Sequence, residues 1–431
     1  MENRMANNLF LKKRLIINVL IIFFSSIIIS FLIFLASFAM EENQSIEDLY
    51  FKGVSLLENE NEYDKALEVF KEILNYNPDH PEAHYQIGQI HRLTNQPETA
   101  KIYYQNAINL KSEYLSARYN LGLVELEIKE YSNALDSFKE TIRINPEFPD
   151  AHYSLGLVYL QLEQFTKAID SFKQALLLNP GDFHFHFGLG IAYKKTGSYS
   201  EAIQSFNQAL SLKPDFGDAF YELGFTYRSL EQYSNSINAL EKAAHYLPEQ
   251  SDEIHYQIGM MFLKLENHNQ AIEALEKAIQ NNEEFTDAYY YLGWLYNQVS
   301  QNDKAIESYE KVITLNPTYT HVYYNLGWAY NDSEKYQEAI EKFKESIKQN
   351  PDDADSHYAL AWTYGKLEEY EMAQESFQET IRIEPDYTYA HYGLGMAFLA
   401  LGERSFALEE YKILKELDEK LADLLFNQIY P

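Results

Sequence analysis

The sequence has no cysteine, only three tryptophans and few basic residues. Without cysteine, the chain has no disulfide, no thiolate nucleophile and no cysteine-based metal site. Lys and Arg total 35 against 65 Asp and Glu, which gives a net charge of −30. A chain this acidic repels nucleic-acid phosphates and anionic lipid headgroups. The composition therefore favours a neutral or cationic partner and predicts no nucleic acid.

One long uncharged run lies near the N-terminus. Residues 15–39 contain no charged side chain, and Lys12, Lys13 and Arg14 directly precede them. As a helix, this run would reach about 37 Å at ~1.5 Å per residue, enough to cross a bilayer. The positive-inside rule places residues 1–14 in the cytoplasm and everything after residue 39 outside it. We therefore expect a single-pass membrane anchor.

The alternative for the same run is a cleaved signal peptide. Ser37-Phe38-Ala39 is similar to the small-x-small sequence of a cleavage site. Cleavage there would leave a periplasmic or secreted protein. A signal h-region is usually shorter, roughly 7–15 residues, so the retained anchor is the favoured interpretation. Both interpretations place the rest of the chain beyond the membrane.

A motif recurs through most of the remaining chain, nearly always at 34-residue steps. Its clearest copy lies in residues 320–353 and contains Tyr323-x2-Leu326-Gly327-x2-Tyr330, Ala339-x3-Phe343 and Pro351. A glycine inside a helix costs about 1 kcal/mol relative to alanine. Its recurrence in register therefore predicts a packing role, in which two helices approach too closely for a side chain. The motif glycine recurs at Gly53, Gly88, Gly122, Gly156, Gly190, Gly224, Gly259, Gly293, Gly327 and Gly395, with Ala361 in the one remaining slot.

This motif resembles the tetratricopeptide repeat, a helix–turn–helix unit of 34 residues. The resemblance covers residues 46–416, with 40–45 as a linker and 417–431 as a capping helix. It implies an all-α fold of about eleven helix pairs in a right-handed superhelical solenoid, behind one N-terminal transmembrane helix. Proteins of this family are non-catalytic scaffolds whose concave face binds peptides or protein partners. The resemblance thus implies a protein or peptide partner, no enzyme activity and no cofactor.

The three tryptophans share one slot of the motif, directly after the glycine or its alanine replacement. Each follows a tyrosine by four residues, and residues at i and i+4 share one face of a helix. We expect the six side chains to form a continuous aromatic strip on the concave wall that binds the partner. The alternative is that each indole packs on the next repeat. The pairs are Tyr290 with Trp294, Tyr324 with Trp328, and Tyr358 with Trp362.

Basic and histidine side chains give two further sets of candidates. Lys194, Lys195 and Arg228 fall near the ends of consecutive first helices, where cations complement the helix dipole. Their functional interpretation is a pocket for a partner carboxylate. Six of the twelve histidines stand four residues before the motif glycine or its replacement, and we expect them to stack at helix interfaces. A metal site at His184 and His186 is disfavoured, because rings at i and i+2 of a helix diverge.

Two functions are compatible with the sequence. The favoured one is a membrane-tethered interaction scaffold that binds a protein or peptide segment in an aromatic concave groove. The alternative is a structural subunit of an envelope export or polysaccharide-secretion assembly, in which the groove aromatics stack on sugar rings.

Overall fold

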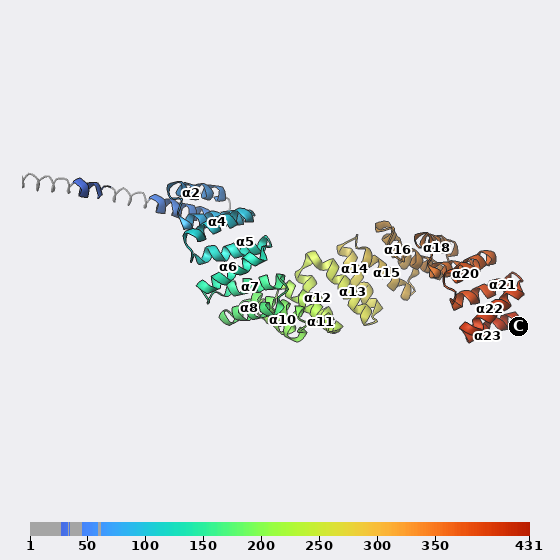
Figure 1. The fold of residues 1–431 in the computed structure, drawn as a ribbon. Coiled ribbons are helices and arrows are strands. Elements are labelled where there is room, and N and C mark those ends of the chain that lie inside the picture. Colours follow the sequence, from blue (N-terminus) through green and yellow to red (C-terminus); the bar gives the residue numbers. More distant parts are fainter. Residues whose placement is uncertain (1–26, 33, 35–44, 59–61) are drawn as a thin grey trace, which may run out of the picture. The chain divides into compact units, whose positions relative to one another are not determined.

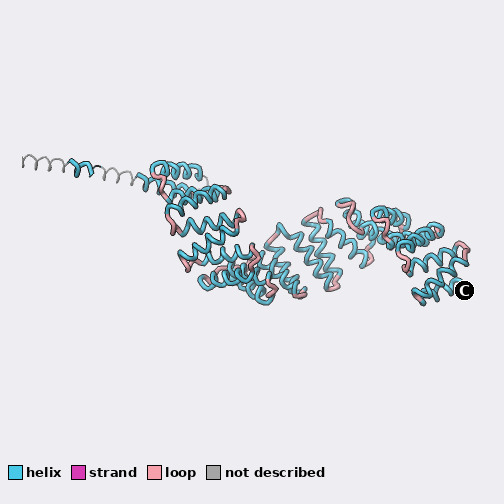
Figure 2. The backbone as a smooth tube through the Cα atoms, viewed as in Figure 1, coloured by secondary structure: helices cyan, strands magenta, loops and turns pink. Residues whose placement is uncertain are grey.

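The structure, a computed structural model, describes residues 27–32, 34, 45–58 and 62–431. All regular structure in these residues is helical, joined by short loops (Figure 2). Residues 45–57 form the helix that precedes α2. A 3₁₀ turn, η2 (Pro248–Gln250), lies directly before α13 (Ser251–Lys264). The helices that follow are α2 (Tyr63–Tyr76), α3 (Pro81–Leu93), α4 (Pro97–Leu110), α5 (Leu115–Glu127), α6 (Tyr131–Ile144), α7 (Pro149–Gln161), α8 (Phe165–Leu178), α9 (Phe183–Lys195), α10 (Tyr199–Leu212), α11 (Gly217–Ser229), α12 (Tyr233–Tyr246), α13 (Ser251–Lys264), α14 (His268–Asn281), α15 (Thr286–Gln298), α16 (Asn302–Leu315), α17 (Val322–Asp332), α18 (Tyr336–Gln349), α19 (Ala354–Lys366), α20 (Tyr370–Ile383), α21 (Thr388–Ala400), α22 (Arg404–Leu417) and α23 (Glu419–Ile429).

The described part of the chain divides into two compact bodies, an N-terminal body that ends at Gly197 and a C-terminal body of residues 198–431. Within each body, every labelled helix packs on the helix before it and the helix after it (Figure 1). Odd-numbered helices from α3 to α21 are the first helices of the repeats, and even-numbered helices from α2 to α22 are the second. The register predicted from the sequence is thus confirmed as a solenoid of helix pairs. The last helix, α23, packs on both α21 and α22.

The motif glycine brings the two helices of a repeat together over a large side chain. A Cβ atom added to Gly327 would lie 2.6 Å from the ring of Phe343 on the second helix. The same contact recurs in seven other repeats at 2.6–2.8 Å, against Phe, Tyr or Leu. The ring lies closer, and the alanine backbone comes second, as at Ala271, whose oxygen lies 3.4 Å from the added Cβ of Gly259.

The repeat that carries Ala361 solves the same packing problem differently. Ala361 stands there in place of the motif glycine. The ring of Phe377 packs against the next first helix, where a Cβ added to Gly393 would be only 2.3 Å away, and Phe172 makes a similar contact at Gly188, at 2.9 Å. The absence of a side chain at Gly393 therefore leaves room for the ring of Phe377.

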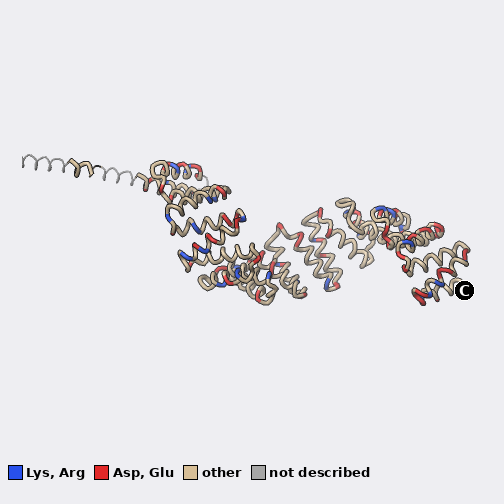
Figure 3. The backbone as a smooth tube through the Cα atoms, viewed as in Figure 1, with Lys and Arg blue, Asp and Glu red and all other residues tan. Residues whose placement is uncertain are grey.

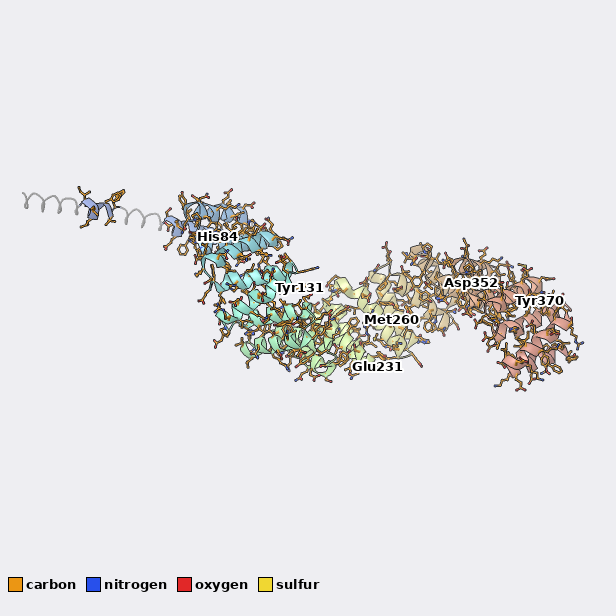
Figure 4. All side chains as sticks on the ribbon, in the orientation of Figure 1. His84, Tyr131, Glu231, Met260, Asp352 and Tyr370 are labelled. Atoms are coloured by element: carbon orange, nitrogen blue, oxygen red, sulfur yellow. The ribbon has the colours of Figure 1, made fainter. Side chains whose placement is uncertain are left out.

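The turn between the two helices of a repeat has a left-handed residue. The N–H of Glu334 bonds to the carbonyl of Asn331, and the N–H of Lys335 bonds to the carbonyl of Tyr330, both at 2.9 Å. These two bonds form a Schellman motif, which satisfies carbonyls at the end of the helix. Glycine suits the left-handed position best, yet most repeats use another residue. The residues with positive φ in these turns are Asn95, Lys129, Glu163, Gly197, Glu231 (labelled in Figure 4), Glu266, Ser300, Glu334, Glu368 and Gly402.

The histidines before the motif glycine bind the preceding loop. In five of the six, Nε2 lies 2.8–3.1 Å from the carbonyl oxygen of the proline six residues earlier. His255 instead contacts the carbonyl of Ser251 through Nδ1. Only His84 among the six has a ring contact among the described residues, with Tyr103. The stacking interpretation is thus wrong for most of them, because the ring nitrogen satisfies a loop carbonyl. The five bonded to proline are His84, His152, His186, His357 and His391.

The predicted membrane span lies outside the described residues, apart from residues 27–32 and 34. These seven residues are helical and their side chains are exposed. Within the described part of the chain, no helix has both the length and the apolar character needed to cross a bilayer.

The ring contact predicts that Gly327→Leu destabilises its repeat. The added side chain must displace Phe343 and separate α17 from α18, an overpacking cost of at least ~1–3 kcal/mol. The matched control is Gly365→Leu, since an added Cβ at Gly365 meets nothing within 4 Å. Urea denaturation followed by circular dichroism checks both variants, and equal midpoints would show that the motif glycine has no packing role.

The left-handed turns predict that substitutions at two positions change the free energy of unfolding in opposite directions. Gly402 has φ +80 with open space around it, so Gly402→Ala costs about 1–2 kcal/mol from backbone conformation alone. Glu334→Gly relieves that strain but adds roughly 0.5–1 kcal/mol of unfolded-state entropy, so it leaves a small net stabilisation. Thermal melting of both variants measures the difference, and the same sign of shift in both contradicts the assignment.

Candidate functional site

The three predicted tryptophans lie on consecutive first helices, α15, α17 and α19. Trp294 is 37% exposed, and Trp328 and Trp362 are half-buried. None of the indoles is buried between repeats, so each presents part of its surface to solvent. The rings of Trp328 and Trp362 lie 5.5 Å apart between centroids. The ring neighbour of Trp294 is His268 on α14, at 6.0 Å.

Two of the tyrosines that are paired with these tryptophans also contact the next repeat. The ring of Tyr290 packs at 4.9 Å on Tyr319, which lies in the loop before α17, and its hydroxyl accepts a hydrogen bond from Nδ2 of Asn325. Tyr358 stacks in the same way on Tyr387, the N-cap residue of α21, at 5.1 Å. These contacts join one repeat to the next.

The third tyrosine of the predicted strip has a different environment. Asp353 takes the loop position before α19, so Tyr324 has no aromatic ring there. Its ring contacts are with Trp328 and Phe343. Burial raises the pKa of Tyr324, as it does those of Tyr290 and Tyr358, so all three hydroxyls remain protonated at neutral pH. A protonated hydroxyl can donate as well as accept a hydrogen bond.

Aromatic side chains line a cavity at the end of the C-terminal body, which we name the C-terminal groove. It has a volume of about 700 Å³, which lies within the range of small-ligand and peptide-anchor pockets. Its walls come from α19, α20, α21 and α23, and Tyr370, labelled in Figure 4, begins α20. The main lining residues are Tyr358, Trp362, Lys366, Tyr370, Phe377, Tyr389, Tyr392, Met396, Leu421, Leu424 and Gln428.

Lys366 is the one charged residue among those that line the C-terminal groove. Its ammonium group lies 4.7 Å from the ring centre of Trp362, a cation–π contact. Tyr389 and Leu424 are well exposed, so the groove is open to a partner. Tyr358 and Trp362 are predicted as binding residues from the motif, whereas Lys366, Tyr389 and the residues of α23 have no signal in the repeat pattern.

A second cavity, of about 730 Å³, lies beside Trp294. Tyr290 also lines it, so the first predicted pair meets in one place. Met260 on α13, labelled in Figure 4, and Lys264 contribute from the preceding repeat. The predicted side chains are therefore divided between two cavities: Tyr290 and Trp294 line the second cavity, and Tyr358 and Trp362 line the C-terminal groove. Trp328 lines neither cavity but is in ring contact with Trp362.

The first helices around these cavities carry little charge. In α15, α17 and α19, Asp, Glu, Lys and Arg occur only in the first or last turn, and α21 has none of these four residue types. The second helices carry more acidic and basic residues than the first helices, and red and blue segments are interspersed along the tube in Figure 3. An aromatic surface with few charged side chains thus lies within a strongly acidic chain.

The predicted basic candidates do not all fall in one body. Lys194 and Lys195 occupy the last turn of α9 in the N-terminal body, and Arg228 occupies the last turn of α11 in the C-terminal body. Arg228 donates a hydrogen bond to Oε1 of Gln257 at 2.7 Å and lies 4.4 Å from the ring centre of Phe225. A carboxylate pocket built from these residues stays a prediction.

Histidines and carboxylates do not gather into a metal site among the described residues. His184 contacts Oδ1 of Asp182 at 3.2 Å, whereas His186 contacts the carbonyl of Pro180. The two rings therefore have separate partners.

Sequence profiles of known families match most of the chain. Profiles described as tetratricopeptide repeat or TPR repeat together cover residues 124–215, 217–244, 252–285 and 286–387, more than half of the 431 residues. A profile described as anaphase-promoting complex, cyclosome, subunit 3 matches residues 59–141. No curated protein matches the chain.

Several solved structures resemble parts of the chain. YrrB, described as a TPR protein with an unusual peptide-binding site, is 27% identical, with a TM-score of 0.39 over 46% of this chain and 98% of its own. A MamA structure is 30% identical, with a TM-score of 0.36 over 40% of this chain and 93% of its own. A tetratricopeptide repeat protein from Parabacteroides merdae is 21% identical, with a TM-score of 0.44 over 58% of this chain and 99% of its own.

The different exposures of the indoles predict different accessibility to a quencher. Of three variants that each keep one tryptophan and replace the other two by phenylalanine, the one that retains Trp294 should be quenched most by acrylamide. Trp328 should be quenched least, because Tyr324, Phe343 and Trp362 surround it. Stern–Volmer slopes measure the order, and a steeper slope for Trp328 than for Trp294 would contradict this description.

Proposed function

Since the chain belongs to the tetratricopeptide repeat family, we propose that it is a non-catalytic interaction scaffold that holds a protein segment against the aromatic surface of its C-terminal body. The observation that carries the proposal is the C-terminal groove, where partly exposed Trp and Tyr side chains stand on packed helices. Aromatic anchors on rigid elements lose little conformational entropy on binding, and they dominate the energy of many interfaces.

The chemistry of the partner follows from the lining of the groove. Its walls offer aromatic and aliphatic surface, tyrosine hydroxyls and the amide of Gln428, but no carboxylate. A segment with exposed apolar or aromatic side chains would remove this surface from water, at about 25 cal/mol per Å² of apolar area. The net charge of −30 opposes nucleic acid and anionic lipid headgroups as partners.

We further propose that the scaffold is tethered to a membrane through residues 15–39. The support is the absence of charge over this run and the basic cluster that precedes it. The tether would leave the repeats outside the cytoplasm. Mass spectrometry of the mature N-terminus decides between a retained anchor and a cleaved signal: a chain that begins at Met40 contradicts the tether.

A test of the groove uses the full chain in detergent micelles and a phage library of random dodecapeptides. Peptides selected on the wild-type chain are synthesised, and their affinities are measured by fluorescence polarisation. The combined replacement of Trp294, Trp328 and Trp362 by alanine should weaken binding at least tenfold, since hot-spot truncations cost more than about 1 kcal/mol each. Helix content should be retained, because the indoles are not fully buried.

The matched control is the replacement of Phe51 and Tyr76, two well-exposed aromatics of the N-terminal body, by alanine. This variant should bind the selected peptides as the wild type does. Equal weakening in both variants contradicts the groove as the site. If no peptide is selected but neutral oligosaccharides bind the wild type and not the tryptophan variant, the alternative role in a polysaccharide-secretion assembly is favoured.

A further inference from the structure

His391 in the last repeat lies between two hydrogen-bond acceptors. Its Nε2 is 2.8 Å from the carbonyl oxygen of Pro385, and its Nδ1 is 2.6 Å from Oε2 of Glu410 on α22. The side chains of His391 and Glu410 are only 4% and 12% exposed.

The two acceptors fix the number of protons on this pair. A carbonyl oxygen and an ionised carboxylate can only accept hydrogen bonds, so both ring nitrogens must donate and the ring is an imidazolium. If the shared proton moves to Glu410, the pair still holds the same number of protons. The register-equivalent His84, His152, His186 and His357 bond to their prolines alone, and none of them meets a carboxylate in a hydrogen bond or ion pair of the described structure.

The surroundings of His391 favour the positive charge. The cleft beside it, of about 520 Å³, is lined from α22 and its N-cap by Glu403, Glu409 and Glu410. Glu409 is paired with Lys412 at 2.9 Å. Helix α20 contributes the uncharged Gln374 and Gln378, and the loop before α21 contributes the carbonyl of Pro385. Burial alone would lower the pKa of His391, but its bonds to Glu410 and Pro385 outweigh burial and raise that pKa.

We propose that the proton held between His391 and Glu410 is a pH-sensitive latch that fixes the last repeat and, with it, one wall of the C-terminal groove. Helix α21, which carries His391, also carries the groove residues Tyr389 and Tyr392, and α23 packs on α21. Loss of the proton leaves a mostly buried carboxylate without its histidine donor, which is unfavourable. The latch does not depend on what the groove binds.

The direction of the pH effect follows from the direction of the pKa shift. A histidine whose pKa is higher in the folded state stabilises the fold fully below its unfolded pKa of about 6.5. That stabilisation is lost as the pH rises through the folded pKa. The last repeat should therefore loosen at alkaline pH, while repeats whose histidine has no carboxylate partner should not.

Hydrogen–deuterium exchange of the full chain in detergent micelles, between pH 6 and 9 and corrected for intrinsic rates, tests the latch without a partner. Protection of peptides from residues 388–429 should fall as the pH rises, by about tenfold for each unit between the folded and unfolded pKa values. Peptides from residues 322–349 serve as the internal reference. Equal pH dependence in both segments overturns the proposal.

The variants separate the latch from general effects of histidine removal. His391→Gln should flatten the pH profile of residues 388–429, and so should Glu410→Gln. His357→Gln, at the same motif position without a carboxylate partner, should leave that profile as in the wild type. A wild-type profile in His391→Gln overturns the proposal, and the wild-type comparison alone still decides if a variant does not fold.

Discussion

The contact between a large ring and the backbone of a glycine is the constraint on which each repeat depends. It sets how closely the two helices approach, and this distance places every other side chain of the repeat. In most repeats, an aromatic residue of the second helix fills the space left by the missing Cβ, and Leu240 and Leu275 do so where no ring is present. The glycine lowers intrinsic helix stability, and burial of a whole side chain against it offsets this loss.

A second set of contacts joins one repeat to the next. The tyrosine three residues before the motif glycine packs against the residue that caps the following first helix, as in the pairs Tyr85 with Tyr114, Tyr119 with Phe148 and Tyr256 with Phe285. Polar side chains complete the junction, since Nδ2 of Asn120 donates to the hydroxyl of Tyr85. Tyr290 and Tyr358, two of the tyrosines predicted to bind a partner, make the same junction contact, which limits the substitutions they can accept.

The sequence predicts the repeat register and the packing role of Gly327 because a helical glycine carries a cost that needs a structural reason. The sequence does not decide whether the tryptophans line a groove or pack between repeats, because the same residue types occur in both places. Lys366, Tyr389 and Leu424 come together only through the stacking of α19, α21 and α23, which no local pattern reveals. The histidine–carbonyl bonds had a signal in the sequence: a proline lies six residues before five of the six histidines.

The position of the Phe377 ring makes the residue that position 393 can accept depend on the residue at position 361. With alanine at 361, the ring of Phe377 excludes any side chain from 393. If 361 first became glycine, the ring could return to its own repeat, and 393 would then accept a side chain. The reverse order passes through an overpacked intermediate. The two substitutions are therefore not interchangeable in order: of the two mutational routes between the same end states, only the one that changes 361 first avoids the overpacked intermediate.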